Sequence, residues 1–144
     1  MPRESTTKFA DLALLTLIYP FNVTTEEETE QILKNVEYHL VREKGVIRYK
    51  LDRYYNKNID GFSEEAEWCF GLSWLAIIYA ERGDKEKAYY YLRRAKKTVT
   101  EEGKVPELYY SNSDIPNENT PLGWAESMYV VALQKVKELE AATA

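Results

Sequence analysis

Residues 68–95 of this 144-residue chain read WCFGLSWLAIIYAERGDKEKAYYYLRRA, and this stretch decides the fold class. Apolar residues recur every three or four positions on both sides of Gly83, which predicts two helices joined by a tight turn. Asp84 is a favourable N-cap for the second helix. Small residues such as Ala76 and Ala88 let two antiparallel helices approach closely. The stretch therefore predicts a helical hairpin.

The same periodicity continues on both sides of the hairpin, so we expect an all-α chain of about five helices. Pro20 disfavours α conformation before it and ends the first helix near Tyr19. Overlapping capping boxes at Thr24 and Thr25 begin the second, and Gly45 ends it. Thr120-Pro121 caps the last, with proline at its first position. The expected helices cover residues 9–19, 25–45, 63–83, 84–103 and 120–139.

Two long irregular stretches, residues 46–62 and 104–119, separate these helices. Both are rich in turn-forming Asn and Asp. Long loops in a compact domain are usually functional. We therefore expect residues 1–144 to form a single domain whose functional site lies at the end of the helices that carries these loops.

Composition excludes several classes of function. The formal net charge of −5 argues against nucleic acid as a partner but leaves a neutral sugar possible. The longest apolar stretch, Leu12 to Phe21, is too short to span a membrane, and no secretory signal opens the chain, so a cytoplasmic location is expected. Cys69, the single cysteine, is expected to be buried and reduced. His39 has no partner at metal spacing, so neither a metal nor another cofactor is expected.

Three sequence islands lie just outside the predicted helices. They are Arg48-Tyr49-x-x-Asp52-x-Tyr54-Tyr55, Gly103-x-Val105-Pro106-Glu107 and Pro121-Leu122-Gly123-Trp124. In this order they resemble the sugar-facing loops of glycoside hydrolase family 15, the glucoamylase group. The resemblance covers nearly the whole chain. It implies antiparallel helical hairpins that form the C-terminal part of an (α/α)6 toroid, with the glucan site at one end.

The resemblance also implies a set of sugar contacts. A guanidinium and a carboxylate offer donors and acceptors to adjacent hydroxyls, and flat aromatic rings suit the apolar faces of glucose. The residues expected to bind an α-glucan or maltooligosaccharide are Arg48, Tyr49, Asp52, Tyr55, Trp68 and Trp124. Arg48 and Asp52 have an alternative role as a loop-stabilising ion pair. Trp74 is expected in the core.

Glu107 is similar in position to the family's general base. Such enzymes invert the anomeric centre, so the base activates a water across the ring from a general acid, with the two carboxyls about 6.5–9.5 Å apart. The alternative for Glu107 is a solvated loop carboxylate. Leu108 follows it where family enzymes usually have glutamine, and Ala125-Glu126 replaces the residues expected after the final tryptophan.

These departures leave catalysis open. The string Val105-Pro106-Glu107-Leu108-Tyr109-Tyr110 is similar to the toroidal domain of phosphorylase kinase α and β subunits, a relative usually regarded as regulatory. One alternative to a hydrolase is therefore a non-catalytic carbohydrate-binding or regulatory toroid. A second is a tetratricopeptide-like interaction module, because residues 75–95 match one such unit, although the pattern does not recur.

The family's general acid lies in a tryptophan–glutamate–glutamate loop upstream of the first island, and no such loop precedes Arg48. The similar string Glu64-Glu65-Ala66-Glu67-Trp68 follows the island and is expected to begin a helix. A partial ring leaves apolar helix faces uncovered. The expected partner is therefore the upstream half of the toroid or a second copy of the chain.

We predict that this polypeptide alone does not hydrolyse α-glucan at an enzymatic rate. General acid assistance contributes about 10²–10⁴-fold, and a base alone leaves the departing oxygen unprotonated. A reducing-sugar assay on the purified chain measures this directly, and turnover by the lone chain contradicts the prediction.

Overall fold

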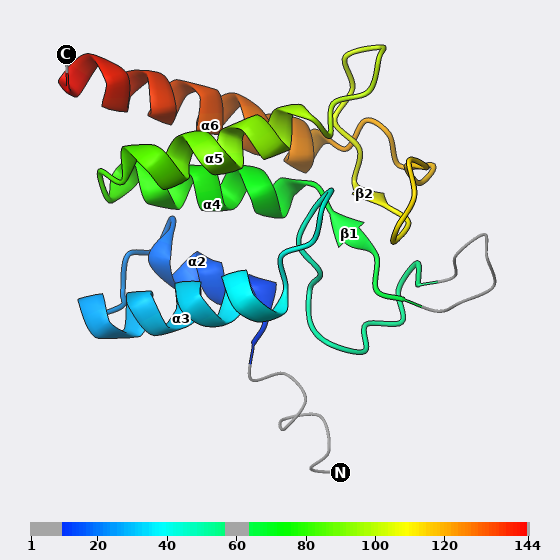
Figure 1. Ribbon diagram of the computed structural model, residues 1–144, viewed down its shortest axis with the longest axis horizontal. Helices are drawn as coiled ribbons and strands as arrows, with labels where there is room; N and C mark the ends of the chain where they lie inside the picture. Colours follow the sequence, from blue (N-terminus) through cyan, green and yellow to red (C-terminus); the bar gives the residue numbers. More distant parts are fainter. Residues whose placement is uncertain (1–9, 57–63, 144) are drawn as a thin grey trace, which may run out of the picture.

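The computed structural model describes residues 10–56 and 64–143. The helices are the 3-10 helix η1 (Leu12–Leu14) and the α-helices α2 (Leu15–Ile18), α3 (Glu26–His39), α4 (Phe70–Glu81), α5 (Lys85–Lys96) and α6 (Gly123–Ala142). Two short strands, β1 (Glu67–Trp68) and β2 (Leu108–Tyr109), pair antiparallel at one end of the bundle (Figure 1). The predicted all-α class is confirmed. Within the described ranges, no helix has both the length and the apolar character needed to cross a membrane.

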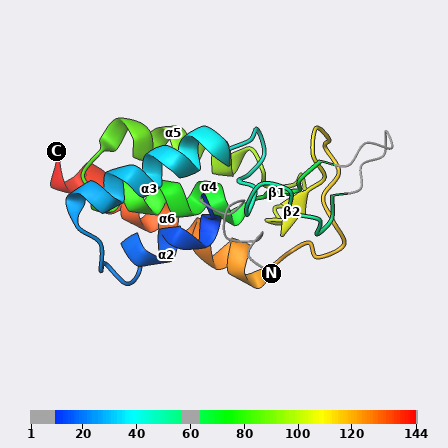
Figure 2. The same cartoon turned by 90° about the horizontal axis from the view of Figure 1, so that it is seen from below.

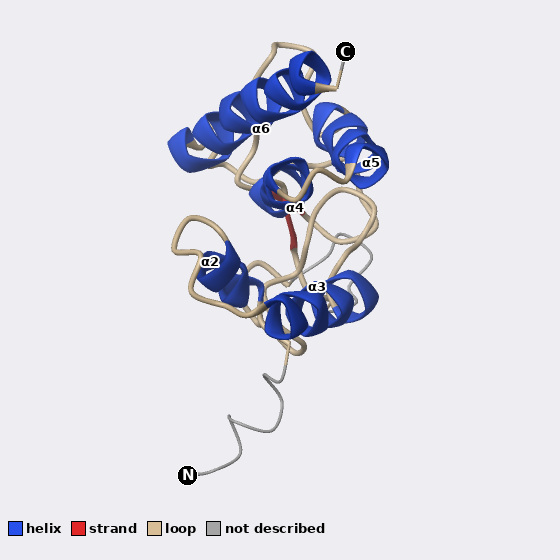
Figure 3. Ribbon diagram, turned by 90° about the vertical axis from the view of Figure 1, so that its left-hand side faces the viewer, coloured by secondary structure: helices blue, strands red, loops and turns tan. Residues whose placement is uncertain are grey.

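Helix α4 is the centre of the fold. Every residue from Phe70 to Ala80 is buried. The other helices lie around it, with α2 and α6 toward one side of the molecule and α3 and α5 toward the other (Figure 2). Seen end-on, α4 lies between the pair α2 and α3 and the pair α5 and α6 (Figure 3). A helix that is apolar all round is stable only when it is covered all round, so α4 organises the remaining helices.

The hairpin predicted from residues 68–95 is confirmed as α4 and α5. Gly83 makes the turn with a φ of 76°, a left-handed conformation that favours glycine. The Asp84 side chain accepts a hydrogen bond from the Lys87 N–H and caps α5. Ala88 and Ala95 are buried where α5 packs on α4.

The expected start of α3 and end of α2 are also confirmed. Tyr19 is extended before Pro20, and α2 stops at Ile18. The Tyr19 carbonyl accepts a hydrogen bond from Trp74 Nε1 at 3.0 Å, which fastens this turn to α4. Thr25 and Glu28 form the complete capping box at the start of α3. The predicted start of the first helix, at Phe9, lies outside the described residues.

The predicted end of α3 at Gly45 is wrong. The helix ends at His39, and the chain turns back so that the Ile47 N–H donates to the Leu40 carbonyl at 2.9 Å. Gly45 has another use: a Cβ there would lie 2.6 Å from the backbone of Trp68, so only glycine permits this close approach. Tyr38, beside the last residue of α3, is 81% exposed.

The predicted helix start at Glu64 to Trp68 is also wrong. Trp68 is in a strand that pairs with Leu108 and also with Val46, and α4 begins only at Phe70. Two carboxylates of this segment hold the preceding loop in place. Glu65 accepts a hydrogen bond from the Leu51 N–H, and Glu67 accepts one from the Lys44 N–H. Ser63, predicted to begin this helix, lies outside the described residues.

The end of α5 and the start of α6 also differ from the predicted positions. Helix α5 ends at Lys96, and Gly103 lies in a separate turn with a φ of 78°. Helix α6 begins at Gly123 after Leu122, so Thr120-Pro121 is not its cap. The reason is tertiary, because the Leu122 N–H donates to the Val105 carbonyl at 3.1 Å and holds the preceding chain extended.

Glu37 of α3 connects three helices. Its carboxylate accepts hydrogen bonds from the Tyr79 hydroxyl at 2.9 Å, the Tyr91 hydroxyl at 2.7 Å and Lys87 Nζ at 3.1 Å. The two tyrosine rings stack with centroids 5.8 Å apart. Burial, and then the hydrogen bond to the Glu37 carboxylate, raise the pKa of both tyrosines well above the ordinary value.

We predict that Tyr91→Phe destabilises the protein by about 1–2 kcal/mol, because it removes one buried hydrogen bond to a charged acceptor. Tyr90→Phe is the matched control: it is the preceding residue, and its half-exposed ring makes no contact with Glu37. Its cost should be below about 0.5 kcal/mol. Urea unfolding measures both, and equal costs would contradict a role for the Glu37 contact.

The raised tyrosine pKa values also predict a pH dependence. A tyrosine in the unfolded chain ionises at about pH 10. In the folded state Tyr79 and Tyr91 have raised pKa values and keep their protons above this pH. Their contribution to stability is complete below that pH and is lost as the pH rises above it. Between about pH 9.5 and 11 the wild-type melting temperature should therefore fall more steeply than that of the double variant Tyr79→Phe, Tyr91→Phe.

Candidate functional site

The candidate site is a cavity of about 230 Å³ beside the start of α4, at the end of the bundle that carries β1 and β2. Both long loops reach this end, as the sequence predicted. The cavity is lined by Asp11, Leu12, Ala13, Thr16, Arg48, Tyr49, Trp68, Phe70, Trp74 and Trp124. Four of the six residues predicted to bind sugar therefore come together here.

Aromatic rings from α4, α6 and β1 form most of the wall. Trp124 stacks on Phe70 with centroids 4.2 Å apart and an interplanar angle of 17°. Phe70 in turn contacts Trp68 and Trp74. Trp124 is 53% exposed, whereas Trp68 and Trp74 are buried, so Trp124 forms the open side. The core position predicted for Trp74 is confirmed, and Trp74 also lines the cavity.

Arg48 is held at the cavity by an ion pair. Its Nε and Nη2 donate to the two carboxylate oxygens of Asp52 at 2.6 and 2.8 Å, and this contact raises the pKa of Arg48. The guanidinium lies over the rings of Trp68 at 4.5 Å and Tyr54 at 5.0 Å. Asp52 is only 2% exposed and does not line the cavity. The arrangement is that of a loop-stabilising pair, in which Asp52 orients Arg48.

The two loop tyrosines differ in position. Tyr49 lines the cavity beside Arg48. Tyr55 does not line it: its hydroxyl donates to the Glu118 carboxylate, which raises the pKa of Tyr55, and its ring packs near Tyr110. Tyr55 therefore links the first long loop to the second.

Glu107 is not among the residues that line the cavity. It is 9% exposed, so it is not a solvated loop carboxylate. Its Oε2 accepts hydrogen bonds from the amides of Asn117 at 2.5 Å and Asn119 at 2.7 Å. Among the described residues, no hydrogen bond reaches Oε1. The Glu107 carbonyl accepts from the Cys69 N–H at 3.1 Å, so Glu107 and Arg48 lie on two sides of Trp68–Cys69 at the same end of the bundle.

Sequence reasoning missed five residues of the cavity: Asp11, Leu12, Ala13, Thr16 and Phe70. Phe70 is one helical turn before Trp74, and this spacing was an available signal. The other four gave no signal, because only the packing of η1 and α2 against α4 brings them to the cavity. Cys69 is buried as predicted, and burial raises the pKa of its thiol to about 12, which makes it unreactive. No group of His, Cys, Asp and Glu in the described ranges has the geometry to hold a metal.

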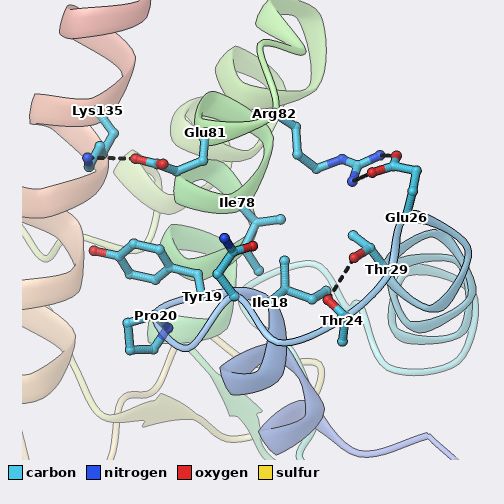
Figure 4. A pocket seen from close by; sticks show the side chains of 11 residues that line it. Ile18, Tyr19, Pro20, Thr24, Glu26, Thr29, Ile78, Glu81, Arg82 and Lys135 are labelled. Carbon is cyan, nitrogen blue, oxygen red and sulfur yellow. Dashed lines mark hydrogen bonds and ion pairs between the residues drawn. The ribbon is translucent and has the colours of Figure 1, made fainter.

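A larger pocket of about 500 Å³ lies at the other end of α4 (Figure 4). Its charged side chains are already paired, Lys135 with Glu81 at 2.6 Å and Arg82 with Glu26 at 2.6 Å. Thr24 and Thr29 bond to each other. No residue predicted to bind sugar lines this pocket.

Comparison with known proteins confirms the predicted resemblance. No family model matches the chain. A probable phosphorylase b kinase regulatory subunit alpha of Caenorhabditis elegans is 29% identical over 91% of this chain and 13% of its own length. An uncharacterized glycosyl hydrolase of Methanocaldococcus jannaschii is 26% identical over 86% of this chain and 21% of its own length.

Solved structures give the same fold. A glycosidase superposes with a TM-score of 0.75 and 21% identity, over 88% of this chain and 36% of that one. A bacterial glucoamylase complexed with acarbose superposes with a TM-score of 0.73 and 19% identity, over 90% of this chain and 20% of that one. The described chain is thus a glucoamylase-like array of helical hairpins, part of an (α/α)6 toroid. It spans a minor share of each of these proteins.

We predict that Asp52→Ala destabilises the protein by about 1–3 kcal/mol, because it leaves Arg48 unpaired in a partly buried position. Asp114→Ala is the control, since Asp114 also pairs with a cation, Lys44, but its side chain is 90% exposed. That variant should cost about 0–1 kcal/mol. Thermal unfolding compares them, and an Asp52→Ala cost no larger than the control would contradict the orienting role.

Proposed function

We propose that this chain forms part of an α-glucan-binding toroid and that its aromatic cavity holds a glucose unit of an α-glucan or maltooligosaccharide. The observation that carries the proposal is the cavity of about 230 Å³, walled by Trp68, Phe70 and Trp124 with Arg48 at its edge. One structural neighbour is a glycosidase variant in complex with glucose, which supports the same ligand class.

The chemistry of the cavity suits a pyranose ring. Such a ring has apolar C–H faces and a polar edge of hydroxyls. The exposed Trp124 ring, held in place by the buried Phe70 ring stacked on it, offers a flat apolar surface to these faces. Arg48 donates its Nε–H and one Nη2–H to the Asp52 carboxylate. Its Nη1 hydrogens therefore remain available as donors to sugar hydroxyls. Asp52 and Tyr55, placed behind the wall, support the site by holding the first loop.

We further propose that the complete toroid is an inverting α-glucan hydrolase and that Glu107 is its general base. Glu107 is a buried carboxylate with one oxygen fixed by two amides, and its backbone bonds to Cys69, which lies between the cavity residues Trp68 and Phe70. The other oxygen is left to accept a proton from water. The general acid would come from the upstream half of the toroid, which is the proposed partner; a second copy covering the same helix faces is the alternative.

A non-catalytic, regulatory toroid of the phosphorylase kinase type is the second candidate. A specific observation favours it: Glu107 does not line the cavity and its Oε2 is fully engaged by Asn117 and Asn119. The resemblance to the phosphorylase kinase subunit adds support. The tetratricopeptide-like alternative has less support, because the fold matches toroid glycosidases.

We predict that maltooligosaccharide quenches or shifts the tryptophan fluorescence of the chain and that Trp124→Ala weakens binding by at least about tenfold, through loss of the stacking surface. Val130→Ala is the control, an exposed apolar residue on the same helix but outside the cavity. Calorimetry measures both variants. Absence of wild-type binding, or equal loss in both variants, would overturn the sugar-binding proposal.

Glu107→Gln separates the two candidate functions. We predict that the chain co-expressed with the remaining part of the toroid hydrolyses maltooligosaccharide, and that the Gln variant binds the sugar normally but loses at least about a hundredfold in rate. Glutamine keeps an oxygen for the two asparagine amides, so the fold is retained. Binding without hydrolysis in both proteins would favour the non-catalytic toroid.

A further inference from the structure

The pocket at the other end of α4 differs in chemistry from the aromatic cavity (Figure 4). Three hydroxyl side chains, one amide, two cations and two carboxylates line it, and only three of its residues are apolar. Its volume of about 500 Å³ falls within the usual range of small-molecule sites, about 300–1,000 Å³. The pocket therefore has the size of a ligand site and a mostly polar wall.

The wall of this pocket carries no net charge, because each of its cations has a carboxylate partner. Lys135 Nζ lies 2.6 Å from Glu81 Oε1, and Arg82 Nη2 lies 2.6 Å from Glu26 Oε1. Figure 4 shows the first pair on the side of α6 and the second on the side of α3. An ionic ligand would have to displace one of these partners, whereas a neutral ligand leaves both pairs in place.

The wall still has hydrogen-bonding groups that the protein does not use. Among the described residues, no hydrogen bond reaches the Tyr19 hydroxyl or Glu81 Oε2. Thr29 donates its hydroxyl to the Thr25 carbonyl at 2.9 Å, so its 2.8 Å contact with Thr24 is a bond that Thr24 donates. Thr24 Oγ1 therefore keeps its lone pairs as acceptors. Hydroxyl groups of a ligand, which both donate and accept, suit this mixture.

The wall is also held in place before any ligand binds. Trp74 Nε1 donates to the Tyr19 carbonyl at 3.0 Å, and the Val23 N–H donates to the Leu17 carbonyl at 2.9 Å, so the turn between α2 and α3 is fixed. The two ion pairs connect the end of α4 to α6 and to α3. A preformed wall lowers the entropic cost of binding.

We propose that this pocket is a second carbohydrate site, which binds a neutral sugar of one or two rings. Tyr19, Glu81 and Thr24 exchange hydrogen bonds with the sugar hydroxyls, and Ile18 and Ile78 contact its C–H groups. A neutral sugar has many hydroxyls and no charge, which matches a polar wall without net charge. No residue lines both this pocket and the aromatic cavity, so the second site does not depend on the function proposed for the cavity.

The test is an NMR titration of the full chain with maltose and, separately, with inorganic phosphate. We expect maltose to shift the backbone amide signals of Thr24, Thr29 and Arg82, and phosphate to leave them unchanged. Tyr19→Phe, which removes only the hydroxyl, should weaken maltose binding at this pocket by at least about threefold. In both proteins the Trp124 indole signal reports on the aromatic cavity separately.

A pair of double variants provides the matched control. Glu81→Ala with Lys135→Ala removes an ion pair of the wall and should weaken maltose binding at this pocket by at least about tenfold. Lys44→Ala with Asp114→Ala removes an ion pair that lines neither site and should leave binding unchanged. Both pairs are partly exposed, so each double variant should keep the fold, which circular dichroism checks.

The outcomes separate the two sites. Maltose shifts confined to the aromatic cavity overturn the second site and leave the function proposed for the cavity intact. Shifts confined to this pocket support the second site and contradict sugar binding in the cavity. Phosphate shifts without maltose shifts, or equal weakening in the two double variants, also overturn the second site.

Discussion

The burial of α4 is the constraint on which the rest of the structure depends. Eleven consecutive residues, Phe70 to Ala80, are buried, so this helix has no face that tolerates water. Covering it requires helices on two sides, which α2 and α3 supply from one direction and α5 and α6 from the other (Figure 3). The polar contacts between helices, such as the Glu37 carboxylate with two tyrosines, form where this packing places them.

The candidate site forms at the end of the bundle where the segment that precedes α4 joins the two long loops. Trp68 pairs with both Val46 and Leu108, so one short strand joins the two long loops. Gly45 permits this because its hydrogen side chain lets two backbones meet. As a result Arg48 from the first loop and Glu107 from the second come to lie on either side of the same two residues. Carboxylates in the entering segment then bind backbone N–H groups of the loops and hold them in place.

The cavity combines features that suit a sugar and departs from what hydrolysis needs on its own. Its walls are largely aromatic and Arg48 is one of its lining residues, a combination that suits the apolar faces and the hydroxyl edge of a pyranose. Glu107 is close by but engaged by two amides. The similar proteins divide in the same manner, because they include both glycosidases and a kinase regulatory subunit. Sugar binding is common to both candidate functions, and the availability of the Glu107 carboxylate distinguishes them.

The sequence by itself determined the helical class, the α4–α5 hairpin, the Thr25 and Asp84 caps, and which loops meet at the site. Those features depend on residues close together in the chain, through periodicity, capping and turn chemistry. Only the tertiary structure decided that Trp68 is in a strand, that Asp52 is buried behind Arg48, and that Asp11 and Thr16 are among the residues that line the cavity. Each of these depends on partners more than twenty residues away or on burial, and a local pattern carries no information about such contacts.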